Sequence, residues 1–176
     1  INGSAVTILL NYTSFAGLTD VTHLGIFGIS AFSNIPNLQI LAPSSKSEYL
    51  NMLDWALDQN EHPVMILIPG NAVTDREADR DYSNIGRFKV EQQGEKVLAL
   101  GDFCQMGESL AAAVKEKLGF EPTLINPRFA STIDTELLEQ LKEKHSLIVT
   151  LEDGILDGGF GQKIDAYYST SDVKVK

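Results

Sequence analysis

The chain has few of the features that mark secreted, membrane-spanning or nucleic-acid-binding proteins. It contains one cysteine, Cys104, so no internal disulfide can form, which fits a reducing cytosol. No apolar run approaches the roughly 18 residues that a membrane-spanning helix needs. Lysine and arginine number 14 against 24 aspartate and glutamate, and this net charge of -10 argues against nucleic acid or an anionic membrane as a partner.

The N-terminus lacks two further features. It does not begin with methionine, and residues 1–4 carry no basic group ahead of the first apolar segment, so it is not a signal peptide. We therefore expect the sequence to be a piece of a longer protein. Its 176 residues, 43% of them hydrophobic, are enough for one large or two small globular domains.

What the sequence does contain is an alternation of strand-like and helix-like segments. Apolar runs at residues 5–10, 38–41 and 64–68 predict strands, and the uninterrupted first and last runs are typical of parallel strands covered on both faces. Ser45 and Glu48 between the second and third runs have the spacing of a capping box, which predicts that a helix begins there.

That helix carries leucines at a helical spacing. Leu50, Leu53 and Leu57 fall on one stripe, with Met52 and Ala56 beside it, so the leucine stripe is expected to be the apolar side.

Residues 75–94 differ from what precedes them. Six charged residues come almost in series between positions 75 and 81, with no apolar period. This predicts an exposed linker that divides the chain into a unit at 1–74 and a unit at 95–176. Phe88 and Val90 form a possible short strand at the end of the linker.

The second unit repeats the alternation. Strands are predicted at residues 96–100, 123–126 and 146–151, and helices at 107–118, after a capping Asp134, and at 163–168. Strands alternating with helices indicate an α/β fold, here of two doubly wound units.

His23 is the strongest candidate for chemistry. It lies in the sequence T-H-x-G-x-F at residues 22–27, which predicts a loop. Glycine has no side chain, so a ligand can come close to the backbone of such a loop. An imidazole there can orient a substrate or relay protons near neutral pH. The alternative is a surface or packed histidine that donates to a carbonyl. His62 and His145 are expected at the surface, and Cys104 has no histidine near it in sequence.

The 22–27 motif is followed by I-P-N and A-P-S between residues 35 and 44, and the pair resembles the pyrimidine-binding domain of thiamine-diphosphate enzymes of the transketolase group. The family it resembles most is that of the 1-deoxy-D-xylulose-5-phosphate synthases. The second half is similar to the C-terminal domain of the same family, through residues that recur in its motifs: Asn126, Arg128, Phe129, Asp134, Thr150, Glu152, Asp153, Gly158, Gly159, Gly161 and Gln162.

The resemblance implies a transferase that condenses pyruvate with glyceraldehyde 3-phosphate for isoprenoid synthesis. It implies thiamine diphosphate and Mg²⁺ as cofactors, a cytoplasmic homodimer, and a missing N-terminal part of the same polypeptide as the partner of this chain. The catalytic glutamate and the diphosphate–metal site of the family lie in that missing part. We therefore expect no tight cofactor binding by this chain alone.

The resemblance also assigns positions at which this chain departs from the family. An arginine after the first strand is replaced by Tyr12, and an aspartate falls on Thr19, with Asp20 adjacent. A second phosphate-binding arginine is absent where the chain reads Pro69-Gly70. Tyr12, Thr19 and Asp20 are the candidate substrate-binding residues. Two alternatives remain: another transketolase-type C-terminal subunit, or a non-catalytic homologue that serves in dimerisation or regulation.

Other polar residues favour structural roles. Arg128, Asp134, Glu152 and Asp153 are interpreted as hydrogen-bonding groups at strand ends or between the units. The glycines at residues 158–161 precede a helix, where they either cradle an anion or allow close packing of helix on sheet.

Overall fold

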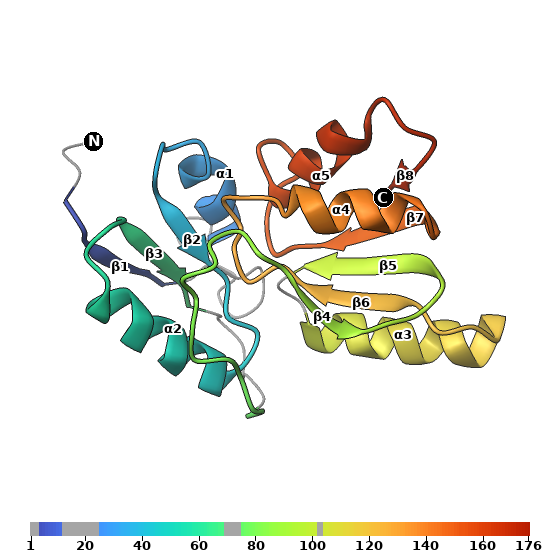
Figure 1. The fold of residues 1–176 in the computed structure, drawn as a ribbon, viewed down its shortest axis with the longest axis horizontal. Coiled ribbons are helices and arrows are strands. Elements are labelled where there is room, and N and C mark those ends of the chain that lie inside the picture. The colour runs from blue at the N-terminus through green and yellow to red at the C-terminus, as the bar shows by residue number, and fades with distance from the viewer. Residues whose placement is uncertain (1–3, 12–24, 69–74, 102–103) are drawn as a thin grey trace.

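The computed structural model describes residues 4–11, 25–68, 75–101 and 104–176, and its strands form two sheets (Figure 1). Sheet A is parallel, in the order β1-β3-β2, with β1 (Thr7–Leu10), β2 (Gln39–Leu41) and β3 (Val64–Leu67). Sheet B has the order β4-β6-β5-β7-β8, with β4 (Lys89–Gln92), β5 (Lys96–Gly101), β6 (Thr123–Asn126), β7 (His145–Leu151) and β8 (Lys174–Val175). Strand β4 is antiparallel to β6, and the other pairs are parallel.

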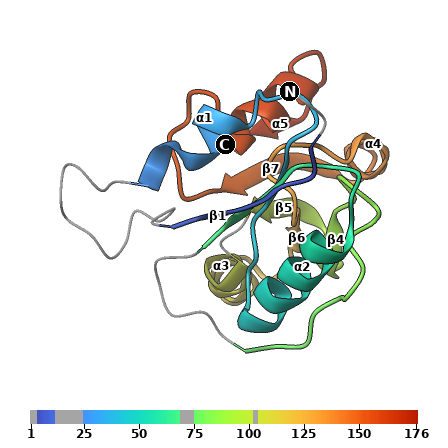
Figure 2. The same ribbon diagram turned by 90° about the vertical axis from the view of Figure 1, so that its left-hand side faces the viewer.

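Helices connect and cover these strands, which confirms the predicted α/β class. They are η1 (Gly25–Phe27), α1 (Gly28–Phe32), α2 (Lys46–Asp58), α3 (Cys104–Leu118), α4 (Thr135–Lys142) and α5 (Phe160–Tyr168). Helix α3 lies on one face of sheet B, and α4 and α5 lie on the other (Figures 1 and 2). None of the helices among the described residues is long and apolar enough to cross a membrane.

The two sheets share one apolar core. Ile40 and Met65 of sheet A belong to the same buried cluster as Ile125 and Ile148 of sheet B. Backbone pairing also joins the two sheets. The segment after β6 runs beside β2, and Phe129 forms an antiparallel bridge with Leu41.

Helix α2 begins where the sequence predicts, but it buries a different face. Ser45 caps it by accepting a hydrogen bond from the Glu48 N–H at 3.1 Å. The buried residues are Glu48, Met52 and Ala56, whereas Leu57 is 64% exposed. The prediction that the leucine stripe is the buried side of the helix is therefore wrong. The buried side is the stripe at positions i, i+4 and i+8 that begins at Glu48, because the polar partners of Glu48 lie in the interior.

Strand β1 is less covered than its apolar sequence predicts. Val6 is 47% exposed, Ile8 39% and Leu9 44%. The expectation of cover on both faces is wrong for these residues because β1 is the end strand of sheet A and pairs with β3 alone among the described strands.

Residues 75–94 are exposed at most of their charged positions, and a few buried side chains anchor the segment; that it is a linker stays a prediction. Tyr82 is 1% exposed and contacts Trp55 edge to face, with ring centroids 6.3 Å apart. Phe88 is buried against Phe160, with centroids 5.9 Å apart. Apolar side chains at every third position, with Ile85 between these two, anchor an otherwise charged stretch. The short strand expected at its end is β4, and the division of the chain at this segment stays a prediction.

His145 is buried, at 2% exposure, and the surface position predicted for it is wrong. Its Nδ1 lies 3.2 Å from the Leu141 carbonyl oxygen and its Nε2 lies 2.8 Å from Thr123 Oγ1. A proton on Nδ1 satisfies the carbonyl, and Nε2 then accepts from the Thr123 hydroxyl. Burial lowers the pKa of His145, an effect that the hydrogen bond to Leu141 only partly opposes.

This histidine should make the fold sensitive to mild acid. The unfolded chain takes up a proton near the ordinary pKa of 6.5, whereas folded His145 does so only at lower pH. Its contribution to the free energy of unfolding is therefore complete above about pH 6.5 and is lost as the pH falls towards the folded pKa. We expect His145→Gln to flatten the fall in stability between pH 7.5 and 5.5 in urea titrations. His62→Gln, at a partly exposed position, is the control, and parallel curves for His145→Gln and the wild type would contradict the assignment.

Candidate functional site

The carboxyl ends of the sheet A strands meet at one edge of the sheet, where open α/β sheets bind ligands. Strands β1, β2 and β3 end there at Leu10, Leu41 and Leu67, since all three are parallel. The predicted site residues follow two of these ends along the chain. His23, Tyr12, Thr19 and Asp20 come after β1, and the Pro69-Gly70 pair comes after β3. All of them lie outside the described residues, so their roles stay predictions.

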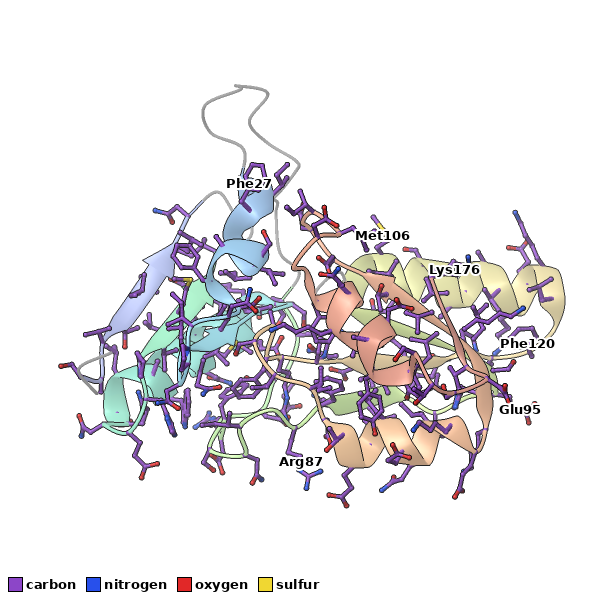
Figure 3. The ribbon with its side chains drawn as sticks, turned by 90° about the horizontal axis from the view of Figure 1, so that it is seen from above. Phe27, Arg87, Glu95, Met106, Phe120 and Lys176 are labelled. Carbon is purple, nitrogen blue, oxygen red and sulfur yellow. The ribbon has the colours of Figure 1, made fainter. Side chains whose placement is uncertain are left out.

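The described chain resumes at Gly25, and the loop between β7 and α5 contacts it. The Ile155 N–H donates to the Ile26 carbonyl oxygen at 3.1 Å. Ser33 Oγ donates to the Gly158 carbonyl oxygen at 3.3 Å, at the other end of α1. Figure 3 shows Phe27 at the start of this helix, clear of both sheets. The residues that follow β7 therefore hold both ends of the segment 26–33.

Lys163 of α5 also contacts the end of α1. Its ammonium group donates to the carbonyl oxygens of Ser33 at 3.2 Å and Ser131 at 2.9 Å. Burial lowers the pKa of Lys163, and the nearby Glu152 carboxylate opposes this shift. The amine thus bridges the end of α1 and the segment after β6.

Glu152 occupies the N-terminus of α5. Its Oε2 accepts a hydrogen bond from the Gly161 N–H at 2.5 Å, and its buried Oε1 has no hydrogen-bond partner among the described residues. Burial raises the pKa of Glu152, against the N–H groups of Gly161 and Phe160, which lower it. The anion at this glycine-rich helix start is thus the chain's own carboxylate.

The glycines themselves are required by packing. A Cβ on Gly159 would lie 2.1 Å from Glu152 Oε1, and a Cβ on Gly161 would lie 2.6 Å from Thr150 Oγ1. Gly158 adopts φ +76°, which side chains rarely allow. Close packing of the helix start against the end of β7, one of the two interpretations of this motif, therefore accounts for Gly159 and Gly161, and the positive φ accounts for Gly158.

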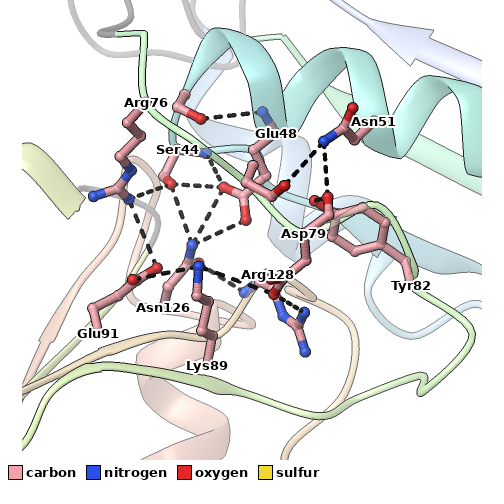
Figure 4. Close-up of polar contacts among 12 residues, drawn as sticks. Ser44, Glu48, Asn51, Arg76, Asp79, Tyr82, Lys89, Glu91, Asn126 and Arg128 are labelled. Carbon is pink, nitrogen blue, oxygen red and sulfur yellow. Dashed lines mark hydrogen bonds and ion pairs between the residues drawn. The ribbon is translucent and has the colours of Figure 1, made fainter.

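A second polar cluster joins the two sheets at the carboxyl ends of β2 and β6 (Figure 4). Glu48 Oε2 accepts hydrogen bonds from Ser44 N at 2.7 Å and Ser44 Oγ at 2.6 Å. Asn126 Nδ2 donates to Glu48 Oε1 at 3.1 Å. Arg76 extends the cluster, because its Nη2 donates to Ser44 Oγ at 2.7 Å while its Nη1 pairs with Glu108.

Sequence reasoning recognised Glu48 as a helix-capping residue but missed this cluster. Asn126 lies 78 positions away in the chain, and no local pattern links the two residues. The available signal was the density of charge at residues 75–81 just ahead of the second unit, which includes Arg76.

Arg128 and Asp134 bind different partners, as expected of interunit hydrogen-bonding groups. Arg128 donates to Asp79 Oδ2 at 3.1 Å and to the Arg87 carbonyl oxygen at 2.8 Å. Asp134 caps α4 at the Leu137 N–H, as predicted, and its other oxygen accepts from the N–H of Phe88 at 3.1 Å. These groups hold the 75–94 segment against sheet B.

Most polar side chains among the described residues hold parts of the chain against one another. Few of them have an atom left without a hydrogen-bond partner that could act on a substrate. Within residues 4–11, 25–68, 75–101 and 104–176, no group of three or more His, Cys, Asp or Glu is placed to hold a metal ion. Both carboxylate oxygens of Glu48 already accept hydrogen bonds from Ser44 and Asn126. Glu152, with its unpaired oxygen and raised pKa, is the described acid best suited to proton exchange.

Comparison with known sequences gives a consistent result. A family model described as the transketolase C-terminal domain matches residues 86–175. The 1-deoxy-D-xylulose-5-phosphate synthase of Lachnoclostridium phytofermentans is 30% identical over 174 residues, which cover 95% of this chain and 27% of that protein. The enzyme of the same name from Clostridium perfringens strain 13 is 36% identical over 166 residues, covering 92% and 26%. The chain thus spans about a quarter of the length of these relatives.

Solved structures share the fold. A structure described as a split-gene transketolase, an inactive β4 tetramer, superposes with a TM-score of 0.77 at 20% identity, covering 96% of this chain and 55% of that one. Transketolase from Leishmania mexicana superposes with a TM-score of 0.64 at 15% identity, covering 82% and 22%.

Proposed function

This chain belongs to the transketolase C-terminal domain family, and from that membership we propose that it is the C-terminal part of a thiamine-diphosphate-dependent transferase like 1-deoxy-D-xylulose-5-phosphate synthase. The observation that carries the proposal is identity of 30–36% to synthases of that name over nearly the whole chain. In this role the assembled protein condenses pyruvate with a glyceraldehyde-type acceptor. It is a cytoplasmic homodimer, and a further polypeptide portion completes it.

His23 is the catalytic residue in this proposal. The loop that bears it starts from the carboxyl edge of sheet A and rejoins the fold at Gly25, where Ile26 is tied to Ile155. An imidazole held at that edge can donate or accept a proton at the carbonyl oxygen of the acceptor. Thr19, Asp20 and Tyr12 precede it on the same segment and are proposed to bind substrate.

The described residues do not fit the diphosphate–metal half of the cofactor site. The helix starts of α2, α4 and α5 carry acidic groups that are already bonded. Glu48 accepts from the Ser44 N–H, Asp134 from the Leu137 N–H and Glu152 from the Gly161 N–H. None of the three is free to receive a phosphate. We therefore propose that the remainder of the protein supplies the diphosphate and Mg²⁺ site, and that this chain alone binds thiamine diphosphate weakly.

A second candidate is a separate subunit of a split transketolase. The extensive superposition on a split-gene transketolase chain favours it, since this chain covers 55% of that shorter protein. The choice of donor separates the two candidates, because a transketolase subunit would serve sugar phosphates as donors in place of pyruvate.

The test of the main proposal is turnover by the assembled protein. We expect pyruvate-dependent condensation with glyceraldehyde, and a loss of about a hundredfold in kcat for His23→Ala, the lower end of the range for a general acid–base group. His62→Ala is the matched control and should retain full activity. Turnover with sugar-phosphate donors and none with pyruvate would favour the split transketolase. An unimpaired His23→Ala enzyme would remove His23 from the catalytic role.

A further inference from the structure

A surface cavity lies between α5 and the segment after β6. Its volume is about 560 Å³, which is within the range of pockets that bind small molecules. Its walls are mostly apolar, and the residues that line it are Ser131, Thr132, Ile133, Lys163, Ala166 and Tyr167. Of these six residues, Lys163 alone carries an amine, so it is the group in the cavity best suited to covalent chemistry.

The hydrogen bonds of Lys163 leave one position on its nitrogen open. Two carbonyl oxygens accept from Nζ, that of Ser33 at 3.2 Å and that of Ser131 at 2.9 Å. An ammonium group has three N–H donors, whereas a neutral amine has two donors and a lone pair. The neutral amine can therefore keep both hydrogen bonds while its lone pair takes the remaining direction. Loss of the proton costs Lys163 neither of these bonds.

The surroundings of Lys163 also favour the neutral amine. Burial lowers the pKa of Lys163, and the Glu152 carboxylate opposes this shift. Burial raises the pKa of Glu152 in turn, and its buried Oε1 has no hydrogen-bond partner among the described residues. At a given pH, Lys163 is therefore neutral more often than an exposed lysine. A desolvated, neutral lysine amine is a nucleophile that forms Schiff bases with carbonyl compounds.

We propose that this cavity is a covalent binding site for small uncharged aldehydes, which Lys163 captures as an imine. The lone pair of Nζ forms a bond to the carbonyl carbon, and the carbonyl oxygen takes one proton from the nitrogen. The resulting carbinolamine loses its hydroxyl group together with the second nitrogen proton as water, which leaves a C=N bond. The step needs no oxidant, reductant or cofactor, and it does not depend on the proposed function.

The walls of the cavity determine which aldehydes fit. Ile133, Ala166 and the ring of Tyr167 offer apolar surface to a short carbon chain. The Tyr167 hydroxyl donates to the Glu139 carboxylate, which places a negative charge beside the cavity. The chain as a whole carries a net charge of -10. Both charges disfavour aldehydes that bear a phosphate or a carboxylate.

Capture of an aldehyde changes what Lys163 holds together. The imine nitrogen carries no N–H, or one if it is protonated, so at least one of the bonds to Ser33 and Ser131 is lost. The adduct therefore weakens the link between the end of α1 and the segment after β6.

The test labels the assembled protein with glyceraldehyde and cyanoborohydride, which reduces the imine to a stable secondary amine. Peptide mass spectrometry then locates the labelled lysines. We expect Lys163 to react about tenfold or more faster than the exposed Lys117 of α3, because an aldehyde held in the cavity has a raised effective concentration. The rate at Lys163 should saturate with glyceraldehyde concentration, whereas the rate at Lys117 should rise linearly.

Ala166→Phe fills the cavity without changing Lys163, so it should slow labelling at Lys163 by about tenfold and leave Lys117 unaffected. Asp165→Phe is the matched control, because it adds the same ring at an exposed position of α5 outside the cavity. Circular dichroism checks that Ala166→Phe is folded. If it is not, the relative rates and the saturation in the wild type decide the question.

Three results would overturn the proposal. These are equal labelling rates at Lys163 and Lys117, a rate at Lys163 that does not saturate, and a folded Ala166→Phe protein in which Lys163 reacts as fast as in the wild type. Because no pyruvate is added, labelling is measured apart from turnover. A protein without synthase activity can therefore still capture the aldehyde, and an active one can fail to do so.

Discussion

Glu48→Ala should destabilise the fold by about 2–6 kcal/mol, because two buried or half-buried donors lose their acceptor at about 1–3 kcal/mol each. The donors are the Ser44 N–H and one Asn126 amide hydrogen. Glu48 itself is 3% exposed, so water cannot replace its carboxylate without opening the junction between the two sheets. Urea-induced unfolding of the chain measures the change directly.

Asp54→Ala is the matched control, since Asp54 lies on the exposed side of the same helix. It should change stability by no more than about 0.5 kcal/mol. A double-mutant cycle with Asn126→Ala separates the interaction energy of Glu48 with Asn126 from any general destabilisation of α2. We expect a coupling energy between Glu48 and Asn126 of about 1–3 kcal/mol. A Glu48→Ala variant as stable as Asp54→Ala would show that the cluster does not hold the units together.

The strands were predictable because their sequences carry the pattern of buried parallel strands. Residues 64–68 are a short apolar run and residues 123–126 have two apolar residues between Thr123 and Asn126; they form β3 and β6 nearly residue for residue. The cap at Asp134 and the positive φ of Gly119 after α3 follow the same local logic. These features depend on residues within a few positions of one another.

The errors arose where distant residues decide the outcome. The side that α2 buries is set by Glu48 and Asn126, which no local period connects. His145 was placed at the surface because it is polar and follows a helix, yet Thr123 and Leu141 supply both of its hydrogen bonds in the interior. The exposure of β1 follows from its place at the end of sheet A among the described strands, which its own sequence does not reveal.

The candidate site was accessible from sequence only through the motif around His23 and its resemblance to a family. The structure adds the anchoring of the following segment by Ile155, Gly158 and Lys163. That anchoring was not predictable, because the glycine cluster and Glu152 lie more than 120 positions from Ile26 and have no shared pattern with it.

The assembled protein should use glyceraldehyde 3-phosphate poorly compared with unphosphorylated glyceraldehyde. The resembled family holds the acceptor phosphate with two arginines, through charge-assisted and often bidentate hydrogen bonds. This chain has Tyr12 at one of these positions and the shortened Pro69-Gly70 sequence at the other. Loss of one partner of a buried charge pair costs about 2–5 kcal/mol. Each loss therefore weakens use of the phosphorylated acceptor by at least about tenfold, at about 1.4 kcal/mol per factor of ten.

Steady-state kinetics with the two acceptors and pyruvate measure this preference as a ratio of kcat/KM values. Tyr12→Arg should shift the ratio towards the phosphorylated acceptor by about tenfold or more, since it restores one guanidinium at the position where the family has it. Tyr12→Phe is the control, because it removes the single hydroxyl that Tyr12 can offer and supplies no charge. A wild-type protein that already prefers the phosphorylated acceptor, with a ratio that Tyr12→Arg does not raise, would mean that other cationic groups have rebuilt the phosphate site.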